Sequence, residues 1–104
     1  MAQAAEVIPQ RAPTRPRLVF FHSRVCGRCR RVEGFIAQVL QRRQNHATFV
    51  LQPVDVDEHP DLAERFRVDE IPTLLVVADR RVRNRLSDPR GCREIEDMLK
   101  PWLQ

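Results

Sequence analysis

The sequence predicts an α/β domain built around a mixed β-sheet, with elements in the order strand, helix, strand, helix, strand, strand, helix. Two short runs, residues 18–21 and 74–78, are apolar on both faces, which is typical of strands inside a covered sheet. The strand–helix–strand order of the first half predicts parallel pairing, and a later hairpin adds antiparallel strands. We therefore expect a mixed central sheet flanked by helices on both faces.

The first half of the chain shows a helical pattern after its first strand. Apolar side chains recur at helical spacing from residue 27 to 43, with arginines and glutamines opposite, and Asn45 is expected to end the helix. A second strand is expected at 48–51 and 54–56. It is interrupted or ended near Pro53, because proline cannot donate to a β-ladder.

The second half begins with a short helix that starts at Asp57 or His59, with Pro60 suited to its first turn. The second apolar run then turns sharply into residues 82–86, whose alternation of apolar residues and arginine is typical of an exposed edge strand. A last helix, ended or kinked by Pro101, follows. Its apolar positions are Ile95, Met98, Leu99 and Trp102.

With 104 residues, the chain holds one domain, which we expect at 17–104. Residues 1–16 contain three prolines and are expected to form a flexible tail, in which residues 6–8 have the composition of a short edge strand. No apolar run approaches the roughly 20 residues of a membrane helix, and the first residues lack the pattern of a secretory signal. The expected setting is the cytoplasm, without a membrane partner.

Charge and cysteine content argue against two further classes of protein, nucleic-acid-binding proteins and disulfide-stapled secreted proteins. The net charge is +4, but Lys100 is the only lysine. For this arginine bias we favour an origin in genomic base composition over a function in nucleic-acid binding. Few aromatic residues lie among the arginines, so we expect no nucleic-acid partner. Three cysteines are an odd number, which does not suit a disulfide-stapled secreted scaffold and favours a reducing compartment. We expect a monomer.

The segment Cys26-Gly27-Arg28-Cys29 carries the chemistry. Two thiols three positions apart, where a strand gives way to a helix, can close into a disulfide and reopen. Free N–H groups and the dipole of the helix N-terminus favour an anion, which lowers the pKa of Cys26, and the thiolate is the nucleophile. The charge of Arg28 acts in the same direction and makes the pair more oxidising.

Two other interpretations of this cysteine pair stand beside the redox one. The thiols could be buried structural groups, or one half of a zinc site. A zinc site needs four ligands, and the remaining candidates, Cys92 and three histidines, lack the spacing of a second half-site. Redox chemistry is therefore the favoured interpretation.

With Ile71-Pro72-Thr73 some forty residues after the cysteine pair, the sequence resembles the thioredoxin-fold family from about residue 18 to 103. Residues 54–60 and 66–74 contribute to the resemblance. It implies the thioredoxin-like fold, with a cis bond before Pro72, which would lie against the disulfide. It also implies that the backbone of Ile71 pairs with an extended substrate segment.

The resemblance further implies a thiol–disulfide oxidoreductase that acts on protein disulfides without a bound cofactor. Cys26 would attack the substrate, and Cys29 would resolve the mixed disulfide. The reductant would be a thioredoxin-reductase-like flavoprotein or a small thiol. Two alternatives remain open: a binding module with little turnover, and a glutaredoxin-like glutathione-dependent reductase. Gly91-Cys92 faintly resembles that last family, but its Cys-Pro-Tyr-Cys and Thr-Val-Pro motifs are absent.

Six positions around the expected site depart from the usual thioredoxin residues. They carry Phe20 in place of a buried Asp, Val25 in place of Trp, Arg28 in place of Pro, Pro53 in place of Lys, Glu70 in place of a small or apolar residue and Asp88 in place of Gly. The redox scaffold is kept, whereas the partner surface and the buried proton acceptor are changed.

Two further residues have open interpretations. His22 lies two residues after Phe20, on the same face of the strand. It is a candidate proton acceptor or thiolate partner, because imidazole titrates near neutral pH, or else a packing residue where thioredoxins carry an aromatic. Cys92 is either a regulatory thiol or a small space-filling residue.

Overall fold

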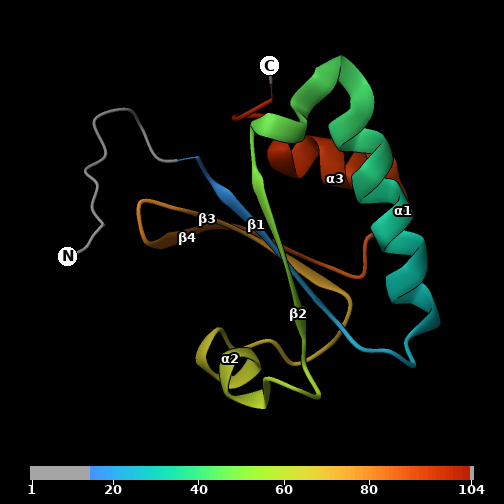
Figure 1. The fold of residues 1–104 in the computed structure, drawn as a ribbon, viewed down its shortest axis with the longest axis vertical. Coiled ribbons are helices and arrows are strands. Elements are labelled where there is room, and N and C mark those ends of the chain that lie inside the picture. The colour runs from blue at the N-terminus through green and yellow to red at the C-terminus, as the bar shows by residue number, and fades with distance from the viewer. Residues whose placement is uncertain (1–14, 104) are drawn as a thin grey trace.

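A computed structural model describes residues 15–103 as a four-stranded mixed sheet with strand order β2-β1-β3-β4 (Figure 1). The strands are β1 (Arg17–His22), β2 (Val50–Asp55), β3 (Thr73–Ala78) and β4 (Arg81–Ser87). β1 pairs with β2 in parallel, and the pairs β1–β3 and β3–β4 are antiparallel. The predicted α/β class and mixed sheet are confirmed.

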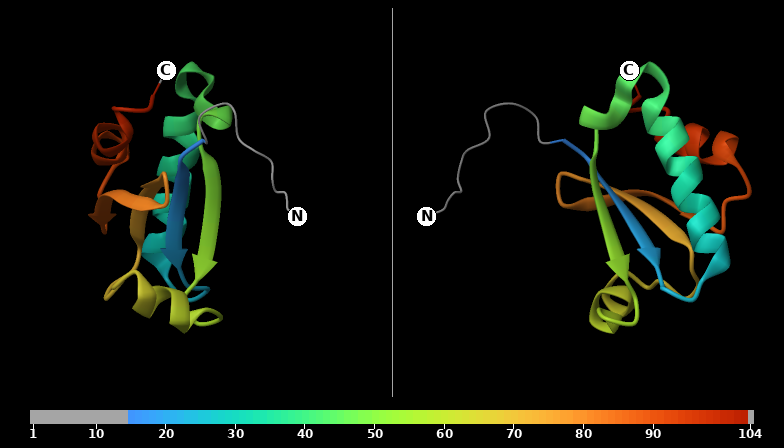
Figure 2. Two further views of the ribbon diagram at one scale, coloured as in Figure 1. Left: turned by 90° about the vertical axis from the view of Figure 1, so that its left-hand side faces the viewer. Right: turned by 45° about the vertical axis from the view of Figure 1, so that its right-hand side comes forward.

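Helices cover both faces of the sheet, as predicted. α1 (Gly27–Gln41) and α3 (Cys92–Leu99) lie side by side over one face, and α2 (Pro60–Arg65) contributes to the core on the other (Figures 1 and 2). Leu18 and Phe20 of β1 enter the core beneath α1 and α3, whereas Val19 and Phe21 enter the α2 core. Successive side chains point to opposite faces of a strand, so a strand covered twice is apolar at every position.

α1 ends two residues earlier than the pattern predicts. It stops at Gln41 and continues as a 3-10 segment, η1 (Arg42–Ala47). Asn45 is buried inside this segment, where its side-chain amide donates to the carbonyl of Arg42 at 3.0 Å and its Oδ1 accepts from Thr48 Oγ1 at 2.9 Å. These side-chain hydrogen bonds compete with α-helical backbone hydrogen bonds, so the chain around Asn45 takes the tighter 3-10 conformation after α1.

The predicted interruption of the second strand at Pro53 is wrong. β2 begins at Val50 and runs through Pro53, which lies opposite Phe20 in the register. β2 is an edge strand with a single neighbour, and proline is tolerated at an edge where its missing N–H would face away from the ladder.

β4 is the other edge strand and is exposed along nearly its whole length, as predicted. The turn before it is made by Asp79 and Arg80, both with positive φ (55° and 65°), as the tight turns of β-hairpins require. α3 ends before Pro101, and Trp102 follows the helix but still packs against the core under α1 and α3.

The expected tail, with its possible strand at 6–8, lies outside the described residues except for its last two. Within the described part, the Pro16 carbonyl accepts a hydrogen bond from the Val50 amide at 2.9 Å, and the Arg15 guanidinium donates to the Ala47 carbonyl at 3.0 Å. Between residues 15 and 103, no helix has both the length and the apolar character needed to cross a membrane.

Candidate active site

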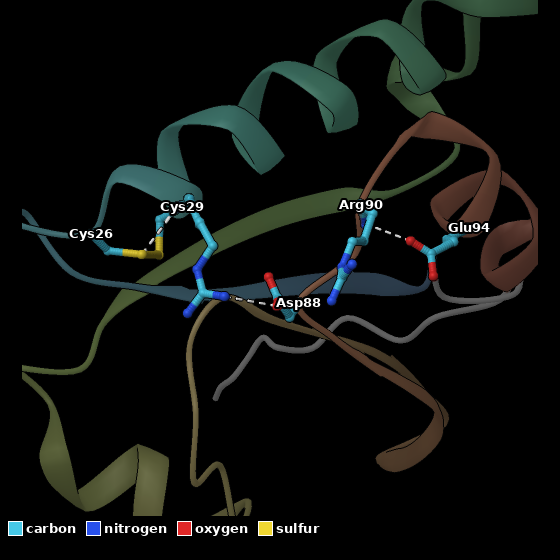
Figure 3. Close-up of polar contacts among 6 residues, drawn as sticks. Cys26, Cys29, Asp88, Arg90 and Glu94 are labelled. Atoms are coloured by element: carbon cyan, nitrogen blue, oxygen red, sulfur yellow. Dashed lines mark hydrogen bonds and ion pairs between the residues drawn. A yellow bond between two sulfur atoms is a disulfide. The ribbon is translucent and has the colours of Figure 1, made fainter.

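Cys26 and Cys29 form a disulfide at the start of α1, with a Cα–Cα distance of 5.2 Å (Figure 3). β1 ends at His22, and a short loop leads to Cys26, the N-cap residue of the helix. The Cys29 amide donates to Cys26 Sγ at 3.0 Å. The sulfur thus occupies the place of a capping oxygen, where the helix N-terminus favours negative charge once the bond is reduced.

The two sulfurs differ in accessibility. Cys29 is 3% exposed and belongs to the core beneath α1 and α3, whereas Cys26 is partly exposed at its margin. Val25, directly before Cys26, is 90% exposed. An incoming thiol or disulfide therefore meets Cys26 first, on a surface with an apolar side chain beside it.

The peptide bond between Ile71 and Pro72 is cis, in agreement with the expectation for Pro72. Pro72 is buried, and Ile71 is partly buried against both cores, one of which contains Cys29. Thr73 Oγ1 donates to the Glu70 carbonyl at 2.7 Å and lies 3.1 Å from Ser87 Oγ, which ties this loop to β4. The predicted contact between Pro72 and the disulfide stays a prediction.

Arg28, between the two cysteines, pairs with Asp88 in the loop between β4 and α3: Nη1 lies 2.9 Å from Oδ2 (Figure 3). The Asp88 amide donates to the Pro72 carbonyl at 2.8 Å. Asp88 has φ 48°, a left-handed conformation that favours glycine and that Asp tolerates. A glycine would adopt this conformation without strain, and Asp88 is one of the positions where the sequence departs from glycine.

Arg28 and Asp88 both stand out in the sequence as departures from the family pattern, but their contact was not predicted. Their opposite charges were the only signal available.

The pairing also changes the expected electrostatics of the site. The charge of Arg28 is shared with Asp88, and Arg24 lies 3.0 Å from Glu58 and 3.7 Å from Asp55. The positive field at Cys26 is therefore weaker than the count of nearby arginines predicts.

His22 is the last residue of β1 and is partly buried. Its ring stacks on Phe20, with centroids 5.2 Å apart and an interplanar angle of 27°. His22, Phe20 and Cys29 all line one hollow of about 330 Å³. The stacking agrees with a packing function, and the hollow shared with Cys29 agrees with a proton-accepting one.

The structure gives no steric reason for a glycine at position 27, and it places Cys92 away from the redox pair. A Cβ built on Gly27 would meet no atom within 4 Å, and its φ is not positive. Cys92 Sγ donates to Gln38 Oε1 at 3.1 Å between α3 and α1. Gln38 follows Cys29 by nine residues, or about 13 Å of helix. Cys92 thus packs away from the redox pair, which agrees with a space-filling function.

Comparisons with known proteins identify the family. The thioredoxin family model matches residues 5–101. The chain is 30% identical over 92 residues to mitochondrial thioredoxin of Mus musculus, covering 85% of this chain and 52% of that protein. It is 30% identical over 90 residues to thioredoxin of Mycolicibacterium smegmatis, covering 83% and 80%.

A solved structure shows the same fold. The oxidised form of mitochondrial thioredoxin 3 from Saccharomyces cerevisiae superposes with a TM-score of 0.71 at 20% identity, covering 84% of this chain and 78% of that one. The chain spans about half the length of the mammalian mitochondrial relatives it matches. The family match covers nearly the whole described chain, including the cysteine pair and the cis-proline loop, and the protein belongs to the thioredoxin family.

Proposed function

We propose that the protein is a thiol–disulfide oxidoreductase that exchanges disulfides with protein substrates through Cys26 and Cys29. The observation that carries this proposal is the disulfide at the N-terminus of α1, with one accessible and one buried sulfur. A structural disulfide has no need of an exposed sulfur, whereas exchange requires that one sulfur can be attacked.

The reduced protein acts in two steps. The Cys26 thiolate attacks one sulfur of a substrate disulfide, forming a mixed disulfide, and the other substrate sulfur leaves as a thiolate that takes a proton. Cys29 then loses its proton and attacks Cys26 Sγ, releasing the second substrate thiolate. Two electrons pass to the substrate, and the Cys26–Cys29 disulfide forms again.

The backbone around the pair supports the first step. The Cys29 amide that donates to Cys26 Sγ also stabilises a thiolate at that atom. Gly27 and Arg28 form the connecting turn, whose position beside the nucleophile makes them supporting residues of the site. The Ile71 backbone, next to Pro72, is the proposed partner of an extended substrate segment, and the exposed Val25 offers an apolar contact directly before Cys26.

The second step needs a base for the Cys29 proton. Phe20 is buried and cannot accept a proton, and it lies opposite Pro53 rather than opposite a charged residue. His22 shares a hollow with Cys29, and we assign it the function of proton acceptor, directly or through water. A packing function for its ring is the competing assignment, and the two are separable by experiment.

The proposed setting is the cytoplasm, as a monomer without a bound cofactor, since the odd number of cysteines suits a reducing compartment. The proposed reductant is a thioredoxin-reductase-like flavoprotein or a small thiol, either of which can attack the accessible Cys26 sulfur. The reduced dithiol formed in this way re-enters the cycle.

Insulin reduction tests the proposal. With dithiothreitol or with a purified thioredoxin reductase system, the wild-type protein should accelerate insulin reduction well above the rate without it, and Cys26→Ser should not. No acceleration with either reductant would overturn the proposal in favour of a binding module. Activity with glutathione but with neither dithiothreitol nor the reductase system would instead assign the chain to the glutaredoxin-like alternative.

A further inference from the structure

A hollow of about 270 Å³ lies beside the active-site turn and is lined largely by arginine. Its walls come from the first two turns of α1 and from the loop between β4 and α3. The lining residues are Arg28, Arg31, Asp88, Pro89 and Arg90. Three arginines and one aspartate thus line the hollow, an excess of two formal positive charges.

The one carboxylate in this hollow is already engaged. Asp88 pairs with Arg28 at 2.9 Å. The nearby carboxylate of Glu94 accepts a hydrogen bond from the backbone amide of Arg90, not from its guanidinium (Figure 3). Between residues 15 and 103, Arg31 and Arg90 take part in no ion pair, and both are exposed. The excess charge is therefore available to a ligand.

The hollow lies next to the place where we expect a substrate segment to bind. Arg28 lies between the two cysteines, and the Asp88 amide is bonded to the Pro72 carbonyl. In the view of Figure 3, Asp88 lies between the disulfide and Arg90. A substrate segment attached to Cys26 and running along Ile71 would therefore have its flanking residues next to this wall of arginines.

We propose that this hollow, the arginine subsite, binds a carboxylate side chain of the protein substrate close to the disulfide that Cys26 attacks. The inference rests on the proposed function and specifies its substrate class: protein segments with Asp or Glu flanking the target disulfide. The guanidinium group suits this ligand, because its planar fork donates two parallel hydrogen bonds to one carboxylate. Arg31 and Arg90 supply the charge that Asp88 does not neutralise.

Three disulfide peptides of equal length test the subsite, with acidic, neutral or basic residues flanking the same disulfide. The measured quantity is the second-order rate constant for oxidation of the reduced wild-type protein by each peptide. The acidic peptide should react about 3–10 times faster than the neutral one, as expected for an exposed charge contact, and the basic peptide more slowly. Raising the salt concentration should reduce these ratios, because it screens exposed charges.

Variants that remove exposed arginine charges at different places show which arginines cause the preference for the acidic peptide. The double variant Arg31→Gln/Arg90→Gln should lower the acidic-to-neutral ratio to about one, whereas Arg81→Gln removes the same type of charge at the opposite end of β4 and should keep the wild-type ratio. An unchanged ratio in the double variant overturns the subsite. An equal loss in Arg81→Gln also overturns it, because the preference would then follow net charge alone.

A second measurement separates the subsite from the redox function. An acidic peptide without cysteine is added to the oxidised protein, and the amide signals of residues 28–31 and 88–91 are followed by NMR. Shifts with the acidic peptide and not with the neutral one are expected, whatever the turnover. If all three disulfide peptides react equally and no shifts occur, the subsite fails and the proposed function stands. If no peptide reacts but the shifts occur, the proposed function fails and the site binds carboxylates.

Discussion

Arg28 Nη1 lies 2.9 Å from Asp88 Oδ2, so the residue between the two redox cysteines is paired with an acid from a loop 60 positions further along the chain. The side chain of Arg28 is 64% exposed and that of Asp88 24% exposed, so solvent screens part of their interaction. The charge next to Cys26 is consequently set by two residues together.

Removing the charge of Arg28 and removing the charge of Asp88 should shift the redox potential of the Cys26–Cys29 pair in opposite directions. Arg28→Gln removes positive charge beside the thiolate, so the pKa of Cys26 should rise and the pair should become more reducing. Asp88→Asn leaves Arg28 unpaired and should make the pair more oxidising. Each shift should be at most roughly 30 mV, the value that corresponds to one pKa unit for a two-electron couple.

The measurement is equilibration of each variant in glutathione buffers of graded potential. Asn tolerates the left-handed backbone at position 88, so Asp88→Asn changes the charge without straining the loop. Shifts of the same sign for the two variants would show that the ion pair orders the loop rather than tuning the thiolate.

The two cysteines should behave differently when each is replaced. Cys26→Ser should abolish disulfide exchange, because the accessible nucleophile is gone. Cys29→Ser should accumulate a mixed disulfide between Cys26 and the substrate, because the resolving thiol is missing. Non-reducing electrophoresis and mass spectrometry of the trapped species check this, and the trapped partner identifies the substrate. Equal trapping by both variants would mean that the attacking and resolving functions are wrongly assigned.

His22→Phe should separate the proton acceptor from the packing residue. Phenylalanine keeps an aromatic ring on Phe20, so a purely packing residue would tolerate the change with normal kinetics. If His22 accepts the Cys29 proton, resolution of the mixed disulfide should slow by about 10²-fold or more near neutral pH, the usual contribution of a general base.

The pH profile of the resolution rate provides a second readout. If His22 accepts the Cys29 proton, the profile of His22→Phe should differ in shape from that of the wild type, because a general base affects the shape of such a profile. His59→Gln, which removes an exposed imidazole at the N-cap of α2, is the control and should keep the wild-type profile. Identical profiles for all three proteins would leave His22 a packing residue.

Restoring the family's buried acid should destabilise this protein. Phe20 is 4% exposed and lies opposite Pro53, where thioredoxins commonly carry a lysine, so Phe20→Asp would bury a carboxylate without that partner. The free energy of unfolding should fall by about 3–5 kcal/mol, as for an uncompensated buried charge. Denaturant titration measures this, with Phe20→Leu expected to lose no more than about 1.5 kcal/mol. The double variant Phe20→Asp/Pro53→Lys should recover part of the loss, and equal losses for Asp and Leu would contradict the argument.

The sequence by itself determined the order of the strands and helices and the centre of the site. Residues 18–21 predicted a doubly covered strand because every side chain of such a strand meets a core, and β1 contributes to both cores. The cysteine pair was placed at a helix N-terminus because strand and helix patterns meet there, and the Ile71–Pro72 bond is cis as the family resemblance implied. The strands, the helices and the place of the cysteine pair depend on periodicity and on residues close in the chain, whereas the cis bond was implied by the family resemblance alone.

Only the tertiary structure decided what surrounds the cysteines. β2 passes through Pro53 because it lies at an edge of the sheet, a property of strand order rather than of local sequence. The Arg28–Asp88 pair and the arginine subsite form because the β4–α3 loop returns to the start of α1, and Asp88 is bonded there to the Pro72 carbonyl. The spacing of exposed charged side chains indicates which face of an element meets solvent, but the contacts between charges on different elements are determined by the folded backbone.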